Sequence, residues 1–493
     1  MTALKTVEAV RPEHIAAMSH EFRTPLNGVL GMARLLESTP LTDEQRAYVD
    51  ALMESGEHLL GLVNDILDFA RLGAGRVELA RTAVSPEDLL RSVCELLSPR
   101  AHEKGIEIGW AAEGALAPIL ADEGRLKQIL LNLAGNAVKF VERGGVLLLA
   151  EAAPGGGLRF TVSDTGPGVP ATERERIFEA FAQADGGRGG GAGLGLAIAG
   201  RLAEAMGGEI GLDSREGDGS DFWFEAAFEP AGRADTRRPL AGRTVAIVSP
   251  SAIVREAAAR QIESSGGRAI RARGVEETLP LTEPGSVVLI DHLLAGDGAP
   301  PTAPEGRAGV VLLRPEERER IDAYRAGGYG AYLIKPLRRA SLVERVLAAG
   351  VGRPPVDDDR VAPLRSTAAP AATGVRVLLA EDNPINAMLA RTLLRREGAC
   401  VEHVLGGEAA LQALLTSTYD LVLMDVRMPG LSGLEATRTL RARGVTTPVV
   451  ALTANAFDDD RRACLDAGMD DFLVKPLSPD ALKAALARWT RVA

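Results

Sequence analysis

Hydrophobic residues recur at helical spacing in two stretches near the N-terminus, residues 12–37 and 43–72, with a polar loop containing Pro40 between them. This pattern predicts two antiparallel helices joined as a hairpin. Two helices with so much apolar surface cannot bury it alone, so we expect two chains to form a dimeric four-helix bundle, which makes the protein a homodimer. A hairpin packed on the next domain of its own chain is the alternative.

Short continuous apolar runs alternate with helical segments in residues 375–493. Each run ends in a polar residue, and such runs are typical of the strands of a doubly wound parallel sheet. Residues 241–351 repeat this plan, which predicts two α/β domains of the flavodoxin-like type. The stretch before them mixes strand and helix patterns and predicts one more α/β domain.

The expected organisation is multidomain, and a length of 493 residues is sufficient for it. The predicted boundaries are residues 1–75 for the helical hairpin, 76–231 for the first α/β domain, 241–351 for the first doubly wound domain, 352–374 for a linker rich in proline and alanine, and 375–493 for the second doubly wound domain.

Composition narrows the functional classes. The formal net charge of −11 argues against a protein that coats nucleic acid, so we expect no nucleic-acid partner. The three cysteines are far apart and have no spacing of a disulfide framework or a metal site, which indicates a reducing compartment. No apolar run approaches the roughly 18 residues of a bilayer span. We therefore expect a cytoplasmic protein without a membrane segment.

One histidine stands out in the first predicted helix, within the block Ala16–Leu26. The neutral imidazole of His20 is a good nucleophile toward phosphorus at pH 7, and Glu21 beside it can accept the proton. Thr24 lies one helical turn further along the same face. The alternative is a surface histidine on an amphipathic helix.

The first α/β domain contains a helix suited to a metal ion and phosphate. Asn132, Asn136 and Lys139 share one face of this predicted helix. Amide oxygens suit Mg²⁺, with Asn136 as the expected ligand, and an ammonium group suits phosphate oxygens.

Two further elements in this domain are suited to a nucleotide. A predicted strand ends in Asp164, whose carboxylate can accept a hydrogen bond from the amine of adenine, and Gly166 and Gly168 let the backbone approach the base. The glycine-rich run 186–196 opens a helix whose free N–H groups can hold phosphates, and it contains Gly193, Leu194 and Gly195. By itself, such a run is equally typical of a flexible linker.

Polar side chains at the ends of the predicted strands should meet at one edge of the second doubly wound sheet. They are Glu381, Asp382, Asp425, Thr453 and Lys475. The three carboxylates can hold Mg²⁺ with Asp425 as the nucleophile, and Thr453 and Lys475 can bind phosphoryl oxygens.

The first doubly wound domain lacks most of this set. Ser249-Pro250 stands where the second has Glu381-Asp382, Arg314 is expected in place of Thr453, and only Asp291 and Lys335 are kept. One carboxylate without an acidic pair should hold Mg²⁺ poorly, so we expect this domain to bind another ligand instead of being phosphorylated.

A group of arginines and a tyrosine indicates what that ligand is. Arginine forks suit phosphate oxygens and the guanine edge, and a tyrosine ring can stack on a purine. The residues are Arg314, Arg318, Arg320, Arg325, Tyr332, Arg338 and Arg339. Glutamates interleaved at positions 316, 317 and 319 are equally typical of a solvated helix face.

These motifs resemble those of known families. The block around His20 resembles the H-box of histidine kinases. The nucleotide elements resemble the N-box, the Asp-x-Gly-x-Gly box and the glycine-rich lid of the GHKL (Bergerat) ATP-binding fold, and Phe178 lies in a run that resembles its F-box. This implies that Asp164 reads adenine. Residues 375–493 resemble a phosphate-receiver domain (here called the receiver), and residues 241–351 resemble a degenerate copy (the pseudo-receiver).

The whole chain resembles the cyclic di-GMP-regulated hybrid histidine kinases in its order of domains. The resemblance implies autophosphorylation of His20 from Mg-ATP, transfer to Asp425 and onward transfer to a histidine phosphotransfer protein. The implied cyclic di-GMP contacts are Arg318, Tyr332, Ile334, Pro336 and Arg338. A GHKL ATPase with appended interaction domains and a ligand-gated scaffold without a phosphorelay are the alternatives.

We expect cyclic di-GMP to be the activating input, because no other segment of the sequence has the pattern of a sensor. Its binding would compete with an internal docking contact through the surface from Tyr332 to Arg339. The Asp357–Arg360 run in the linker is either a solvated charge run or, by the resemblance, part of a lock on the inactive arrangement.

Overall fold

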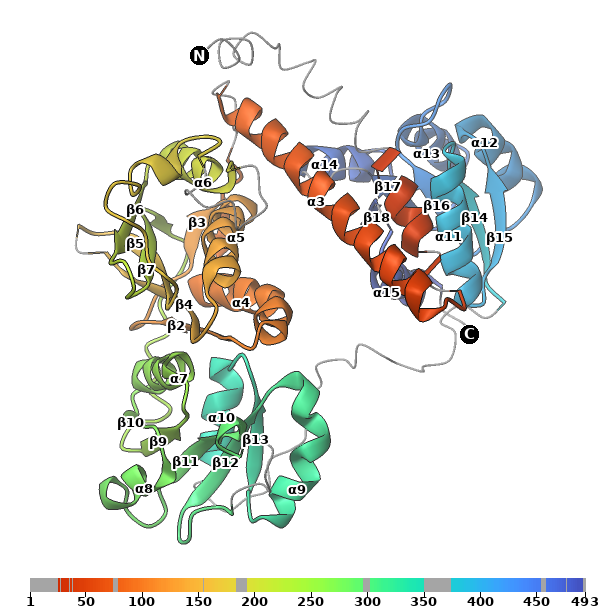
Figure 1. Ribbon diagram of the computed structural model, residues 1–493. Helices are drawn as coiled ribbons and strands as arrows, with labels where there is room; N and C mark the ends of the chain where they lie inside the picture. Colours follow the sequence, from red (N-terminus) through yellow and green to blue (C-terminus); the bar gives the residue numbers. More distant parts are fainter. Residues whose placement is uncertain are drawn as a thin grey trace. The chain divides into compact units, whose positions relative to one another are not determined.

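The computed structural model describes residues 25–73, 79–153, 155–182, 193–295, 302–349, 374–453, 458–475 and 477–490, except positions 27, 35 and 38. These residues fall into two compact units, one within residues 65–361 and the other within residues 13–64 and 362–493 (Figure 1). The predicted phosphotransfer residues His20, Glu21 and Thr24, and the linker up to residue 373, lie outside the described residues.

The N-terminal part is helical where it is described, over residues 25–37 with gaps and then in α3 (Asp43–Gly73). Thr42 and Gln45 form reciprocal hydrogen bonds between side chain and backbone at the start of α3, which fix where this helix begins. A Cβ on Gly56 would lie 2.7 Å from Cδ2 of Leu30, so the glycine allows the two helices to approach closely. None of the described helices combines the length and apolar composition needed to cross a bilayer.

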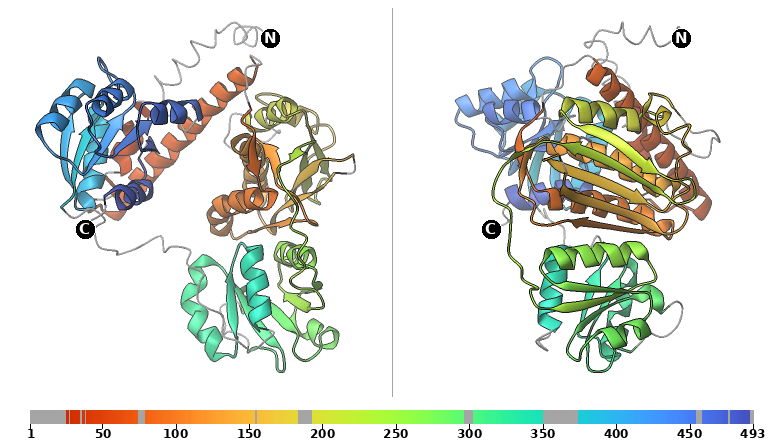
Figure 2. Two further views of the ribbon diagram at one scale, coloured as in Figure 1. Left: turned by 180° about the vertical axis from the view of Figure 1, so that it is seen from behind. Right: turned by 90° about the vertical axis from the view of Figure 1, so that its left-hand side faces the viewer.

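The first α/β domain (the ATP-binding domain) is built on a five-stranded sheet in the order β2-β4-β5-β7-β6, in which only β2 and β4 are parallel (Figure 2, right). Three helices pack on one face of it and form the hydrophobic core. The strands are β2 (Glu107–Ala112), β4 (Gly145–Ala152), β5 (Leu158–Asp164), β6 (Glu209–Ser214) and β7 (Ser220–Ala226), and the helices are α4 (Pro86–Glu103), α5 (Glu123–Phe140) and α6 (Gly195–Ala205). A small sheet holds β1 (Thr82–Val84), β3 (Ile119–Ala121) and β8 (Glu229–Pro230).

The pseudo-receiver and the receiver have the same topology. Each has five parallel strands in the order 2-1-3-4-5, which confirms the predicted flavodoxin-like folds. The pseudo-receiver contains β9 (Thr244–Val248), α7 (Ala252–Ser264), β10 (Arg268–Ala272), α8 (Val275–Thr278), β11 (Val287–Asp291), β12 (Ala308–Leu313), the 3₁₀ helix η4 (Pro315–Arg320), α9 (Ile321–Ala326), β13 (Ala331–Ile334) and α10 (Arg339–Ala349). The receiver contains β14 (Arg376–Ala380), α11 (Pro384–Arg396), β15 (Cys400–Val404), α12 (Gly407–Thr416), β16 (Leu421–Asp425), α13 (Gly433–Ala442), β17 (Val449–Thr453), α14 (Asp458–Asp466), β18 (Asp471–Val474) and α15 (Pro479–Trp489).

The strand register corrects one predicted equivalence between the two copies. Thr453 pairs with the last residue of β18, and Leu313 pairs with the last residue of β13. Leu313 therefore occupies the position of Thr453, and Arg314 lies one residue beyond it. The prediction that Arg314 replaces Thr453 was wrong because it aligned the ends of the apolar runs and ignored the spacing to the following lysine.

Helix α7 of the pseudo-receiver packs along β2, the edge strand of the ATP-binding sheet, and reaches the neighbouring strand β4 (Figures 1 and 2). Leu147 of β4 forms a small buried cluster there with Ile253 and Ala257 of α7. At Gly109 of β2 the strand and the helix are so close that a Cβ would lie 2.8 Å from the Cβ of Ala257. The buried Gln261 donates through Nε2 to the carbonyl oxygen of Trp110 at 2.8 Å and thereby fixes the helix along β2.

Candidate functional site

The receiver brings its predicted acidic residues together. Carboxylate oxygens of Glu381, Asp382 and Asp425 lie within 4.8 Å of one another at the carboxyl ends of β14 and β16. Three oxygen donors at this spacing fit a hard divalent cation such as Mg²⁺. Burial raises the pKa of Glu381, while the ammonium group of Lys475 opposes this shift.

Lys475 connects two of these carboxylates. Its Nζ donates to Oδ2 of Asp425 at 2.7 Å and also to Oε2 of Glu381. Thr453 is buried at the end of β17, the strand next to Asp425. Gly433 lets α13 start directly over the pocket, because a Cβ there would lie 2.0 Å from the backbone oxygen of Asp425. The predicted set of five side chains is thus assembled at one edge of the sheet.

The predicted metal and phosphate residues of the ATP-binding domain lie on α5 as expected. Asn132 and Asn136 are half-buried, and Lys139 is exposed near the end of the helix. Asn132 donates through Nδ2 to the backbone oxygen of Gly195 at 2.9 Å. This bond joins α5 to the first turn of α6, directly after the glycine-rich run, of which residues 183–192 lie outside the described part of the chain.

Asp164 ends β5 with its carboxylate held locally. Its Oδ1 accepts a hydrogen bond from the backbone N–H of Gly166 at 2.7 Å, and burial is the main reason that its pKa is raised. Gly168 has a φ of +72°, and a Cβ there would lie 2.1 Å from the backbone oxygen of Arg215. These glycines are therefore required by the turn itself, and the turn presents Asp164 as an acceptor.

An aromatic cluster supports the lid region. Phe178 and Phe222 pack edge to face with ring centroids 6.5 Å apart. Phe181 and Phe69 pack in the same way with ring centroids 6.4 Å apart. The guanidinium of Arg201 on α6 lies 3.8 Å from the ring centroid of Phe69. The end of α3 is thus packed against the segments that flank the glycine-rich run.

The start of α6 fixes the last residues of that run. Gly193 adopts a φ of +67°, and its backbone oxygen accepts a hydrogen bond from the N–H of Phe181 at 3.0 Å. Leu194 is buried in the core and precedes Gly195, the first residue of α6. The free N–H groups of this helix N-terminus are suited to phosphate.

The predicted ligand residues of the pseudo-receiver adjoin β13 and η4. Tyr332 and Ile334 alternate with the buried Leu333 and share one face of β13, and both are half-buried. Pro336 follows the strand, and Arg318 lies on η4. Arg338 donates through Nε to Oε1 of Glu95 on α4 of the ATP-binding domain at 2.8 Å.

Three family models match the chain in the expected order. The His Kinase A (phospho-acceptor) domain matches residues 11–75, the Histidine kinase-, DNA gyrase B-, and HSP90-like ATPase matches residues 121–230, and the Response regulator receiver domain matches residues 377–487. The structure of full-length ShkA in complex with AMPPNP is 58% identical, covers 98% of this chain and 100% of that chain, and aligns with a TM-score of 0.65. The chain belongs to the hybrid histidine kinases.

Two further relatives of this hybrid histidine kinase are similar over different extents. The sensor protein GacS of Pseudomonas syringae pv. syringae is 35% identical over 98% of this chain and 56% of its own length. The chain therefore spans a little over half the length of the curated relatives it matches. The structure of ShkA_Rec1 in complex with c-di-GMP is 54% identical and covers 22% of this chain and 94% of that chain, with a TM-score of 0.22.

Sequence reasoning missed the acidic residues through which the ATP-binding domain of this kinase holds its pseudo-receiver. Glu87 and Glu95 on α4 accept hydrogen bonds from Arg339 and Arg338, and Glu107 at the start of β2 is buried between two cations. A buried glutamate at a strand end has no distinctive sequence signal. The position of Arg314, in contrast, could have been found by counting, since Thr453 and Leu313 each lie 22 residues before the lysine of the Lys-Pro pair in their own copy.

Proposed function

We infer that this chain is an ATP-dependent protein-histidine kinase that phosphorylates His20 and transfers the phosphoryl group to Asp425 of its own receiver. One observation carries the proposal: the receiver retains all five side chains of an acceptor site, in the same chain as the residues of a nucleotide site and a phospho-acceptor family match. Together the matched domains would supply each stage of the transfer, from the nucleotide to the phospho-acceptor histidine and from there to the receiver.

The nucleotide site would use α5 and the end of β5. Asp164 would accept from the adenine amine, and the alignment of its carboxylate by Gly166 supports this role. Asn132 and Asn136 would help to hold Mg²⁺ and phosphate, with Lys139 near the phosphate oxygens. Bound Mg²⁺ would neutralise charge on the transferred group.

Two displacements account for the relay. In the first, an imidazole nitrogen of His20 bonds to the γ-phosphorus of ATP, ADP leaves, and Glu21 accepts the imidazole proton. In the second, a carboxylate oxygen of Asp425 bonds to the phosphorus and His20 leaves. Thr453 and Lys475 hold the phosphoryl oxygens, and Glu381, Asp382 and Asp425 would hold Mg²⁺.

The partners follow from the same proposal. Half-exposed apolar side chains remain on the described helices of the hairpin, which supports a dimer through a four-helix bundle: Val29, Met32, Leu36, Leu52, Leu59 and Ile66. A histidine phosphotransfer protein would receive the phosphoryl group from Asp425.

The proposed input is cyclic di-GMP at the pseudo-receiver. Tyr332 can stack on a guanine, and the forks of Arg318 and Arg338 can bind phosphate or the guanine edge, next to Ile334 and Pro336. Arg338 is engaged with Glu95 in this structure, so ligand and Glu95 would compete for the same guanidinium. A ligand that binds only the undocked state shifts the equilibrium by about 2.7 kcal/mol at 100 times its dissociation constant.

Transfer of ³²P from ATP tests the relay. We expect acid-labile label on the parent protein, none on His20→Ala, and retained label on His20 in Asp425→Asn, because removal of the acceptor blocks only the second step. A GHKL ATPase or a scaffold would leave all three unlabelled. Equal loss of label with time in the parent and in Asp425→Asn would exclude Asp425 as the acceptor.

The same assay tests the input. Cyclic di-GMP should increase labelling of the Asp425→Asn protein, and Arg338→Ala should bind less ligand and lose the response. Tyr332→Ala should lose the response by the same route, or be active without ligand if the ring also contributes to docking. Equal labelling with and without cyclic di-GMP, in protein that autophosphorylates, would exclude this ligand.

A further inference from the structure

The pseudo-receiver keeps the aspartate and the lysine of an acceptor site but has lost the rest. By strand register Asp291 corresponds to Asp425, Ser249 to Glu381 and Lys335 to Lys475. In the receiver the lysine contacts two carboxylates of its own domain. In the pseudo-receiver one of those carboxylates has become a serine, and Ser249 donates to Oδ2 of Asp291 at 2.6 Å. Among the described residues of the pseudo-receiver, Lys335 thus keeps Asp291 as its one acidic partner.

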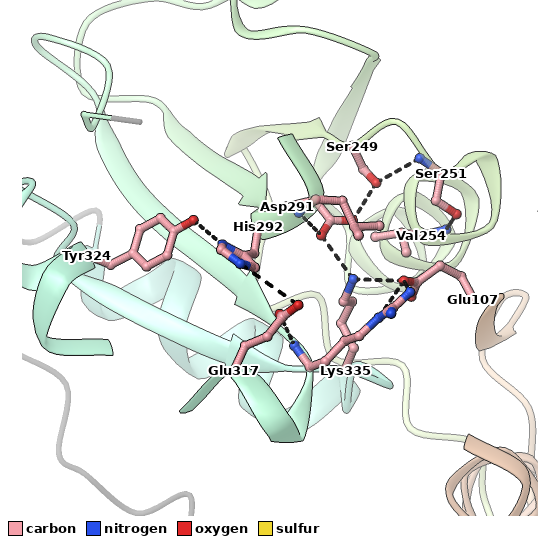
Figure 3. Close-up of polar contacts among 11 residues, drawn as sticks. Glu107, Ser249, Ser251, Val254, Asp291, His292, Glu317, Tyr324 and Lys335 are labelled. Atoms are coloured by element: carbon pink, nitrogen blue, oxygen red, sulfur yellow. Dashed lines mark hydrogen bonds and ion pairs between the residues drawn. The ribbon is translucent and has the colours of Figure 1, made fainter. Parts of the chain in front are cut away.

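The second carboxylate comes from the ATP-binding domain. Nζ of Lys335 donates to Oδ1 of Asp291 at 2.9 Å and to Oε1 of Glu107 at 3.2 Å (Figure 3). Lys335, Asp291 and Glu107 are 2%, 0% and 3% exposed, so water does not screen these charges. Glu107 is therefore the second carboxylate partner of Lys335, as Glu381 is of Lys475.

Arg314 completes the pocket. Its Nε and Nη2 donate to the same Oε1 of Glu107 at 3.0 and 2.6 Å, and its backbone N–H donates to Oε2 of Glu317 at 2.7 Å. Burial disfavours the charge of Arg314, but the Glu107 carboxylate outweighs it and leaves the pKa of the guanidinium raised. Glu107 thus places one carboxylate oxygen against both cations, while Asp291 contacts the Lys335 ammonium and Glu317 contacts the backbone N–H of Arg314.

Both cations adjoin the proposed ligand contacts along the chain. Lys335 lies between Ile334 and Pro336, and Arg314 caps η4, which carries Arg318. A ligand that moves β13 or η4 would therefore move the groups that hold Glu107. This connects the ligand surface to β2, the edge strand of the ATP-binding sheet.

We propose that the former acceptor pocket of the pseudo-receiver is a socket for the Glu107 carboxylate, and that release of Glu107 is the step through which ligand binding frees the ATP-binding domain. The socket itself rests on the contacts above, and the coupling to ligand rests on the proposed cyclic di-GMP site. Removing one partner of a buried charge pair leaves the other uncompensated, so loss of Glu107 should shift the docking equilibrium by at least about tenfold.

Docking is measured in the full chain by double electron–electron resonance between nitroxides. Cys400 is the exposed one of the three cysteines and is replaced by serine. Labels are attached at Glu209→Cys on β6 and Glu276→Cys on α8, both exposed positions. Against the narrow distance distribution of the parent, Glu107→Gln should add longer distances. Arg314→Gln tests the contact from the pseudo-receiver side. The variant with both substitutions should show no larger share of long distances than the more affected single variant, because both substitutions remove the same interaction.

Glu113→Gln is the matched control. Glu113 follows the same edge strand and pairs with Arg260 of the pseudo-receiver at 3.0 Å, but its side chain is 59% exposed. An exposed pair contributes little, so this variant should keep the parental distances. Parental distances in both Glu107→Gln and Arg314→Gln would overturn the socket, as would equal opening by Glu113→Gln.

Calorimetric titration with cyclic di-GMP tests the coupling. Linkage is reciprocal, so Glu107→Gln should bind the dinucleotide more tightly by about the factor by which docking weakens, and Glu113→Gln should match the parent. Equal affinity in the parent and in an open Glu107→Gln protein would overturn the coupling. Failure of the parent itself to bind cyclic di-GMP would instead overturn the proposed ligand, while the label distances still decide the socket.

Discussion

Replacing Gly109 by alanine should separate the pseudo-receiver from the ATP-binding domain without touching any charged group. The added Cβ would lie 2.8 Å from the Cβ of Ala257 and 3.5 Å from Cγ2 of Ile253. Carbon atoms make their best contacts at about 3.5 to 4.0 Å, so strand and helix must separate by roughly 0.7 to 1.2 Å. Neither Cβ can rotate away, because each is fixed to the backbone of β2 or α7. The variant therefore acts as a wedge.

The size of the effect follows from this overlap. Extra methyl groups in a well-packed interface typically cost about 1 to 3 kcal/mol. At about 1.4 kcal/mol for each factor of ten, docking should weaken by roughly 5- to 150-fold. Alanine is favoured over glycine within a strand by about 0.5 to 1 kcal/mol, so the ATP-binding domain itself should not lose stability. The loss should appear only as undocking.

The assay is the distance measurement between labels at positions 209 and 276, with Ala257→Gly as the compensating change. Removing the Cβ of Ala257 eliminates the 2.8 Å contact, at a cost in helix propensity of about 1 kcal/mol in α7. Gly109→Ala should add long distances, and the double variant should return toward the parental distribution. An unchanged distribution in Gly109→Ala, or a double variant as open as the single one, would refute the packing argument.

Other outcomes are expected elsewhere in the chain. Thr24→Ala should slow the loss of phosphate from Asp425 and spare autophosphorylation, if its hydroxyl orients the hydrolytic water; identical decay of the label would exclude this role. Asp164→Asn should abolish binding of a fluorescent ATP analogue yet melt at the same or a higher temperature at pH 7. Burial raises the pKa of Asp164 above its ordinary value, so stability falls as the pH rises from that ordinary value to the raised one, and the full cost of the ionised form is present above it. A lower melting temperature of the variant would contradict this sign. Gly433→Ala should destabilise the receiver by at least about 2 kcal/mol, or roughly 10 °C, because its Cβ would meet the backbone oxygen of Asp425 at 2.0 Å. Gly406→Ala is the control, since its nearest neighbour would lie 3.9 Å away, and an equal melting shift in both would reject the overlap as the cause.

Residues at strand ends could be predicted from the sequence because the strand pattern alone places them. The carboxyl ends of parallel strands share one edge of a sheet, so Asp425 and Lys475 had to lie close together once their strands were recognised. The same reasoning placed Asp291 beside Lys335. Helical spacing likewise put Asn132 and Asn136 on one face of α5.

Contacts between domains could not be predicted in this way. Glu107 reads as the first residue of an ordinary strand, and its burial depends on another domain more than 200 positions along the chain, as its bond to Arg314 shows. No pattern in the residues around Glu107 indicates that it contacts a residue so far along the chain. Arg314 was misplaced because the end of an apolar run in the sequence does not locate the end of a strand as reliably as its pairing with the next strand does. His20, Glu21 and Thr24 stay predictions.

Because Glu107 belongs to the ATP-binding domain, a pseudo-receiver expressed alone lacks one of the carboxylates that its buried cations contact in the full chain. Without the ATP-binding domain, Lys335 and Arg314 would lose the Glu107 carboxylate that both contact, and Arg338 and Arg339 would lose Glu95 and Glu87. A truncated pseudo-receiver should therefore attract anionic ligands more strongly than the intact chain does. If the full-length protein is undocked for only a fraction of the time, its apparent dissociation constant is the intrinsic one divided by that fraction. Affinities measured on the fragment would then set an upper limit on the sensitivity of the whole kinase to its signal.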